Sequence, residues 1–83
     1  MNNMGYGEAA SMTVNTPVAE YIGDLPIRAI LITATVAGNV SLTLSGGGTV
    51  TVAVAVGSVV LPLAAIEVNT SGTTATASYW ALA

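Results

Sequence analysis

The chain has 83 residues, a formal net charge of −3 at pH 7, and neither cysteine nor histidine. This length suits one small domain, while disulfides are excluded and a zinc site is disfavoured, so partner subunits are the remaining support for a fold of this size. Charged residues make up 6% of the chain, against about 25% in ordinary domains, and a single basic residue argues against binding of nucleic acid.

Residues 1–16 show no hydrophobic period, and residues 1–22 are predicted to form an extended N-terminal arm. Two interpretations stay open. The segment is either a frayed terminus or an arm that orders on a neighbouring subunit, with Met4, Tyr6 and Met12 as its anchors. Residues 16–24, where the arm ends, predict a turn or a short edge strand. The start of the chain lacks the basic and apolar regions of a secretory signal.

Residues 23–83 carry the β pattern and are predicted to form a single β-domain. Residues 49–56 alternate clearly, with Val50, Val52, Val54 and Val56 on one face. Glycine-containing turns separate the apolar segments. The predicted strands are 27–33, 40–44, 49–56, 59–63, 64–70 and 75–82. We therefore expect an all-β fold, a small antiparallel β-sandwich or barrel of six to seven short strands with almost no helix.

The turns and one internal similarity add detail to this prediction. Gly38 and Asn39 are suited to a turn with positive φ, residues 45–48 predict a hairpin loop, and residues 57–58 predict a turn. "LPIRAILIT" at 25–33 matches "LPLAAIEVN" at 61–69 in register. We interpret the match as two structurally equivalent Leu-Pro strands related by pseudo-symmetry, although two similar strands also arise by coincidence.

Residues 50–68 are apolar over almost the length of a membrane span. The first half alternates with period two, Gly57 and Pro62 interrupt the run, and valine dominates over leucine. These features favour strands over a spanning helix, and we expect no membrane partner.

The residues needed for most catalysis are absent. Nucleophilic pairs need an imidazole, and there is no lysine or histidine. The four acids, Glu8, Glu20, Asp24 and Glu67, form no evident catalytic pair or metal site. We expect neither enzymatic activity nor a cofactor.

The remaining candidate residues point to contacts between molecules. Arg28 is either the partner of Glu67, Glu20 or Asp24 in a structural ion pair, across a subunit boundary, or an ordinary exposed charge. Three interpretations of Tyr79 and Trp80 stay open. The pair forms a platform for a carbohydrate, anchors an interface, or packs in the core with one ring half-exposed. The candidate interface residues are Tyr6, Arg28, Val52, Val54, Val56, Tyr79 and Trp80.

Several motifs together resemble a family of virion proteins. They are Pro-Ile-Arg-Ala at 26–29, "LSGGGTVT" at 44–51, "GSVVLPL" at 57–63, "GTTAT" at 72–76, and the aromatic pair at 79–80. Over about residues 23–82 the chain resembles the spike base protein of gene transfer agents and related head proteins of tailed phages. It departs from that pattern in an apolar approach to Gly57 and in lacking an arginine after Pro62.

The resemblance implies a non-enzymatic β-domain on the outer surface of a virion. We expect a cement or decoration protein, or a vertex spike base, bound to the major capsid protein and to copies of itself as a trimer or pentamer. A spike or fibre protein is a further candidate partner. The alternative is a receptor- or glycan-binding domain of a phage fibre or spike. A third possibility is a membrane-associated or amyloid-like β-protein.

Overall fold

The computed structural model describes residues 7–83 and contains nine strands and no helix within them. Alternating valines and threonines and frequent β-branched residues favour this outcome. The strands are β1 (Ala9–Met12), β2 (Tyr21–Ile22), β3 (Leu25–Pro26), β4 (Ala29–Val36), β5 (Gly38–Leu44), β6 (Thr49–Val54), β7 (Gly57–Leu61), β8 (Ala65–Asn69) and β9 (Thr76–Leu82). The predicted all-β class is confirmed.

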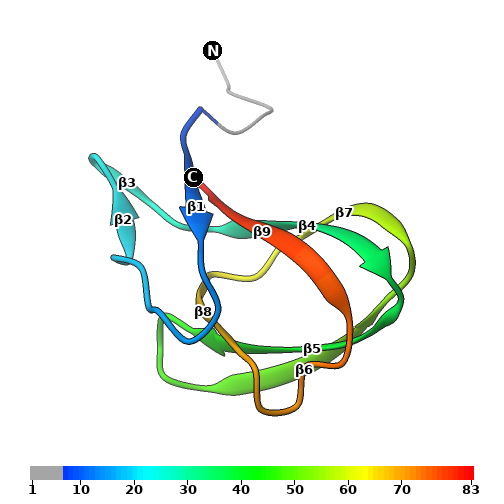
Figure 1. The fold of residues 1–83 in the computed structure, drawn as a ribbon. Helices are drawn as coiled ribbons and strands as arrows, with labels where there is room; N and C mark the ends of the chain where they lie inside the picture. Colours follow the sequence, from blue (N-terminus) through cyan, green and yellow to red (C-terminus); the bar gives the residue numbers. More distant parts are fainter. Residues whose placement is uncertain (1–6) are drawn as a thin grey trace.

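Two antiparallel sheets lie face to face and enclose the core (Figure 1). The first sheet has four strands in the order β1-β9-β4-β7, and the second has three in the order β6-β5-β8. A small hairpin of β2 and β3 stands beside them. Since both sheets present apolar residues inward, this is a small sandwich of the predicted kind.

Two long segments bend sharply and contribute one strand to each sheet: β4 continues into β5, and β6 continues into β7. Only Ala37 separates β4 in the first sheet from β5 in the second, and residues 55–56 separate β6 from β7. Gly38 pairs with Val54, while Ala34 pairs with Gly57. The four-residue advance from Ala34 to Gly38 therefore lies opposite a three-residue advance from Val54 to Gly57. The additional residue marks a bulge, a device that bends and twists a strand.

Gly38 lies at this bend for a steric reason. A Cβ built there would lie 2.6 Å from Thr74 Oγ1 and 2.7 Å from the backbone nitrogen of Ala75. The prediction that Gly38 and Asn39 supply positive φ is wrong, since neither is among the residues with positive φ in the described chain. Close approach of two backbones selects glycine here. The predicted turn at 57–58 is also displaced, because β7 begins at Gly57, which has a φ of 120°.

Residues 9–18, part of the predicted N-terminal arm, join the sandwich of their own chain as a further bent segment. β1 pairs with β9 from Ala9–Leu82 to Met12–Tyr79. The chain then crosses to the second sheet, where the backbone nitrogens of Asn15 and Val18 donate hydrogen bonds to Val68 and Ile66 of β8. Because backbone hydrogen bonds hold this segment, its side chains need no regular alternation.

The internal sequence similarity corresponds to equivalent strand pairing. Ala29, three residues after Pro26, pairs with Leu82 at the end of β9. Ala65, three residues after Pro62, pairs with Leu44 at the end of β5. Both alanines are fully buried. The edge strands match as well. β1 lies beside β9 in the same way that β6 lies beside β5, and residues 15–18 lie beside β8 in the same way that β7 lies beside β4. The two halves of the chain therefore have the pairing pattern of a pseudo-two-fold repeat.

The core lies between the sheets and is aliphatic. Ile30 and Ile32 of β4 face Val40 and Leu42 of β5 and Val68 of β8, and all five are fully buried. Burial of such side chains contributes about 1.5–3 kcal/mol each.

Candidate interaction surface

The outer side of the four-stranded sheet, which we call the outer face, carries a row of neighbouring side chains from all four strands. Directly paired residues of antiparallel strands lie on the same side of a sheet. Trp80 of β9 pairs with Ser11 of β1 and with Leu31 of β4, and Leu31 pairs with Val60 of β7. Ser11, Trp80, Leu31 and Val60 therefore form one row across the sheet.

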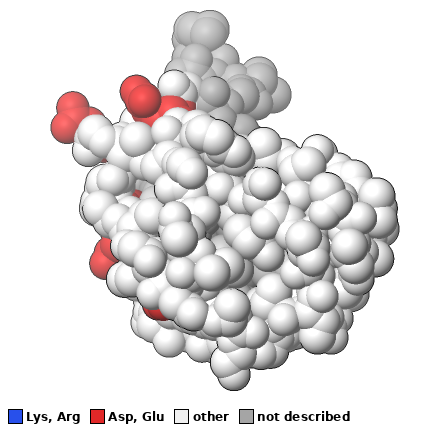
Figure 2. Space-filling view, viewed as in Figure 1, with Lys and Arg blue, Asp and Glu red and all other residues white. Residues whose placement is uncertain are grey.

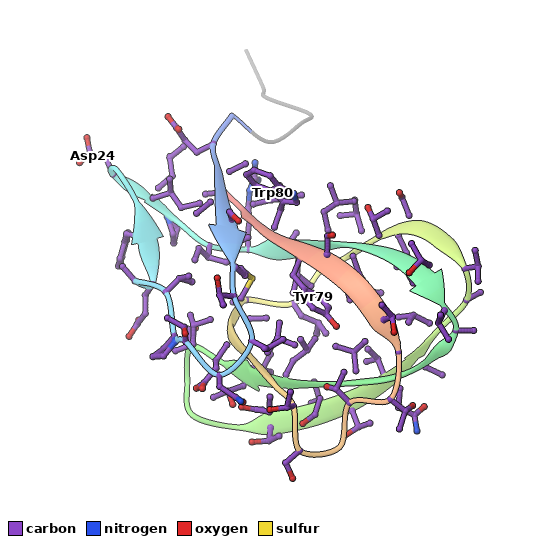
Figure 3. The ribbon with its side chains drawn as sticks, in the orientation of Figure 1. Asp24, Tyr79 and Trp80 are labelled. Carbon is purple, nitrogen blue, oxygen red and sulfur yellow. The ribbon has the colours of Figure 1, made fainter. Side chains whose placement is uncertain are left out.

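Trp80 and Tyr79, adjacent in the sequence, lie on opposite sides of the sheet (Figure 3). The Trp80 side chain is 42% exposed, whereas Tyr79 is 5% exposed and points toward the core. Burial raises the pKa of the Tyr79 hydroxyl above its ordinary value, because the charged phenolate would lose its hydration. Of the two aromatic residues, only Trp80 is available to contact another molecule.

A second row on the outer face consists of hydroxyl side chains. Thr33 pairs with Ser78 of β9 and with Ser58 of β7, and the Thr33 and Ser58 hydroxyl oxygens lie 3.0 Å apart in a hydrogen bond. The face is thus an apolar row bordered by neutral donors and acceptors.

A hollow of about 360 Å³ lies along Trp80, where β1 leaves β9. Ser11, Thr13 and Ser78 contribute hydroxyl groups to its lining, and Val14 and Ala77 contribute apolar surface. This composition suits a neutral, partly apolar group. A second hollow of about 310 Å³ is lined by Gly7, Leu25, Pro26, Arg28 and Ala83, at the side of the β2–β3 hairpin.

The acidic residues gather toward one side of the molecule. Residues 29–66, which include β4 to β7, contain no charged side chain. In Figure 2 the acidic residues lie on the side of β1, β2 and β3, and the opposite side of this view shows none. Asp24 marks the tip of the β2–β3 hairpin and points away from the sandwich (Figure 3). A surface this poor in charge is unusual for a protein that stays dispersed alone.

The structure separates the predicted interface residues into different environments. Val54 is 8% exposed and Val52 is half-buried against the core, so these two valines serve the fold of one chain and do not offer a free surface. Their inward orientation follows from the same alternation that predicted the strand. Val56, in contrast, is 67% exposed at the bend between β6 and β7.

The other predicted residues lie apart from one another. Arg28 is exposed beside the β2–β3 hairpin, and its backbone nitrogen donates to the Leu82 carbonyl. Its predicted ion pair with Glu67, Glu20 or Asp24 stays a prediction. Tyr6 lies outside the described residues. Leu31 and Val60, which lie in the row with Trp80, escaped the sequence prediction because both belong to segments that are apolar on both faces.

The described residues contain no group of three or more His, Cys, Asp or Glu side chains placed to hold a metal ion. In the same part of the chain, no helix is long and apolar enough to cross a bilayer. Comparisons with protein-family models, with curated proteins and with solved structures find no match to this chain. The interpretation of the surface therefore depends on its own chemistry.

Proposed function

We propose that this protein is a non-enzymatic structural component of a phage virion that binds the outer capsid surface as a cement or decoration protein, or as a vertex spike base. It contacts the major capsid protein and copies of itself. The observation that carries the proposal is the uncharged outer face, with the row of Trp80, Leu31 and Val60 across it. The sequence resemblance to spike base proteins adds the context of the virion.

The outer face has the chemistry of a contact with a protein. Exposed tryptophan is enriched among the residues that dominate binding energies at interfaces. The apolar row gains free energy from removal of water, at roughly 25 cal/mol per Å², and the neighbouring hydroxyl row supplies hydrogen bonds that need no charged partner. An extended protein lattice offers both kinds of contact over a broad, flat area.

The first experiment concerns particle composition. Mass spectrometry of purified virions from the phage or prophage that carries this chain is expected to detect it in a fixed ratio to the major capsid protein. Virions of normal morphology without this chain would refute the proposal.

The second experiment assigns the contact to the outer face. Particles lacking the chain are mixed with purified protein, and binding is measured by co-sedimentation. Trp80→Ala is expected to weaken binding about 30-fold, the effect of losing about 2 kcal/mol at an interface hot spot. Tyr21→Ala is the matched control, since Tyr21 is an aromatic residue of β2 with 57% exposure. Equal loss in both variants would contradict a role of the outer face.

A second function is favoured by the hollow beside Trp80. An indole ring next to the hydroxyls of Ser11, Thr13 and Ser78 suits the apolar face and hydroxyl groups of a neutral sugar. Under this alternative the protein is a receptor- or glycan-binding domain of a phage fibre or spike. Binding on a glycan array that disappears in Trp80→Ala and persists in Tyr21→Ala would favour it over the capsid proposal.

A further inference from the structure

β7 is an open edge of the four-stranded sheet. It pairs with β4 on one side, from Ile30–Leu61 to Ala34–Gly57, and in the described part of the chain no strand follows it in the sheet. Alternate backbone N–H and C=O groups of an edge strand face outward and are able to pair with another strand. The occupant that this geometry fits is therefore an extended peptide segment.

The β7 edge lacks two of the features that usually prevent pairing between molecules, a charged residue and a proline within the strand. Soluble proteins protect their edges with charged residues, prolines, bulges or covering segments. β7 reads Gly-Ser-Val-Val-Leu without a charge, and all of it except Leu61 is exposed, including Val59 and Val60 at 37% and 44%. Pro62 follows only after the strand has ended.

The opposite edge of the sandwich provides an internal comparison. Residues 9–18 border β9 and β8 in the way that β6 and β7 border β5 and β4. That edge carries Glu8 at its start, a left-handed residue, Asn15, with a φ of 61°, and Pro17 and Glu20 at its end. Both edges bend and contain a residue of positive φ, Asn15 in one and Gly57 in the other, but only the edge of residues 9–18 is flanked by acidic residues.

We propose that β7 pairs antiparallel with β7 of a second copy of this chain, with the two Val60 residues opposite each other at a two-fold axis. In this register Val59 of each copy is opposite Leu61 of the other, so apolar side chains meet on both faces of the new pair. A two-fold contact at this edge places the same surface on both sides. The acidic residues lie on the other side of each molecule, so pairing does not bring them together.

The pairing joins two four-stranded sheets into one sheet of eight strands. The row of Trp80, Leu31 and Val60 then continues into the same row of the second copy, which doubles the apolar length of the outer face. The inference deepens the proposed function, because it names how copies of the chain contact each other, and it puts a two-fold pair in place of the expected trimer or pentamer. Its test uses purified protein without particles, so either proposal can fail while the other holds.

The decisive test is a cysteine scan, which the absence of native cysteine makes simple. Single variants Ser58→Cys, Val60→Cys and Thr51→Cys are oxidised under mild conditions, and disulfide-linked dimers are measured on non-reducing gels. Val60→Cys is expected to form dimers at least tenfold faster than the other two, because only residues at the axis meet themselves within disulfide distance. Thr51 of β6 is the exposed edge-strand control.

Other arrangements give different patterns. Parallel, in-register stacking, as in amyloid, would link Ser58→Cys and Val60→Cys equally. Pairing of β7 with a different edge, or with a different protein, would link neither variant. Each of these two results would overturn the proposal.

A charge variant provides an independent measurement. Val60→Lys is expected to raise the dimer dissociation constant about tenfold or more, measured by native mass spectrometry, because two like charges would face each other. Val14→Lys is the matched control, since Val14 is an exposed valine that follows β1, the strand at the opposite edge of the same sheet. Circular dichroism establishes that both variants fold. Equal dissociation constants in folded Val60→Lys and wild type would also overturn the proposal.

Discussion

Gly38 and Thr74 are in contact at the bend of the sandwich so closely that a Cβ on Gly38 would lie 2.6 Å from the Thr74 hydroxyl oxygen. The same hydroxyl accepts a hydrogen bond of 2.8 Å from the backbone nitrogen of Asn39. The Asn39 carbonyl in turn accepts hydrogen bonds from Thr74 and Ala75. Hydrogen bonds therefore hold the loop between β8 and β9 against the bend between β4 and β5.

Gly38→Ala tests this contact. The methyl group would overlap both the threonine side chain and backbone atoms, so we expect the free energy of unfolding to fall by about 1–3 kcal/mol, the usual cost of overpacking. Gly46→Ala is the control, because a Cβ there has no atom within 4 Å. Urea unfolding monitored by circular dichroism measures both. Similar stability of the two variants would contradict the steric explanation.

The Thr73 hydroxyl group supports a second prediction. It accepts a hydrogen bond of 2.9 Å from the backbone nitrogen of Ser41, a buried residue of β5, and donates one to the Asn69 carbonyl. Thr73→Val is expected to destabilise the protein by about 1–3 kcal/mol, because a part-buried N–H loses its acceptor. Thr73→Ser keeps the hydroxyl group and is expected to lose clearly less. If serine and valine destabilise equally, the hydrogen bonds are unimportant and packing of the methyl group explains the effect.

The third prediction concerns the stability of the core. Leu42 is fully buried between the sheets, and Leu42→Ala is expected to reduce the free energy of unfolding by about 2–5 kcal/mol, through lost burial and the remaining cavity. Val56→Ala, at a position 67% exposed, is expected to change it by less than about 0.5 kcal/mol. Thermal unfolding monitored by circular dichroism measures both, provided that the protein concentration is held constant. A small effect at Leu42 would mean that the sheets do not pack as described.

Tyr79 predicts a pH dependence in the alkaline range. Burial raises the pKa of Tyr79 in the folded protein, whereas the unfolded chain has the ordinary value of about 10. Above pH 10 the unfolded state therefore loses this proton first, and the free energy of unfolding falls as the pH rises through the folded-state pKa. Tyr79→Phe removes this group's contribution.

The measurement for Tyr79 compares urea unfolding between pH 9 and 11 in wild type and Tyr79→Phe. The absorbance difference between the two proteins near 295 nm reports ionisation of Tyr79 in the folded state. An identical decline of stability with pH in both proteins would exclude Tyr79 as its cause.

The fold could be predicted where side-chain alternation and glycine punctuation coincide. Large apolar residues alternate with small or polar ones in residues 40–44 and 49–56, on both sides of a glycine loop. The structure has β5 and β6 there. β1 gave no such signal, because "AASM" consists mainly of small residues without alternation. It is a strand because its backbone pairs with β9, a relationship between residues 67 to 73 positions apart that no local pattern contains.

The candidate surface was predicted in part, and the reason is the ambiguity of strands that are apolar on both faces. Trp80 was identified as a candidate because a lone tryptophan is conspicuous, but only the register showed that Tyr79 faces the core and Trp80 faces outward. Leu31 and Val60 lie in uniformly apolar segments, where periodicity does not distinguish the buried side. The valines of 49–56 show a different limit: their alternation predicted one shared face, but Val52 and Val54 were predicted to lie at an interface, and the structure places them toward the core.

The pairing of Ala9–Met12 with β9 has a consequence for how the molecule is made. During synthesis β1 leaves the ribosome long before β9, its partner in the sheet. Until β9 follows, residues 29–66 expose an uncharged surface rich in β-branched residues. Closure of so distant a pair is slow, because chain entropy must be lost before contacts compensate for it. Nascent chains are thus open to premature strand pairing with one another until β9 has been made.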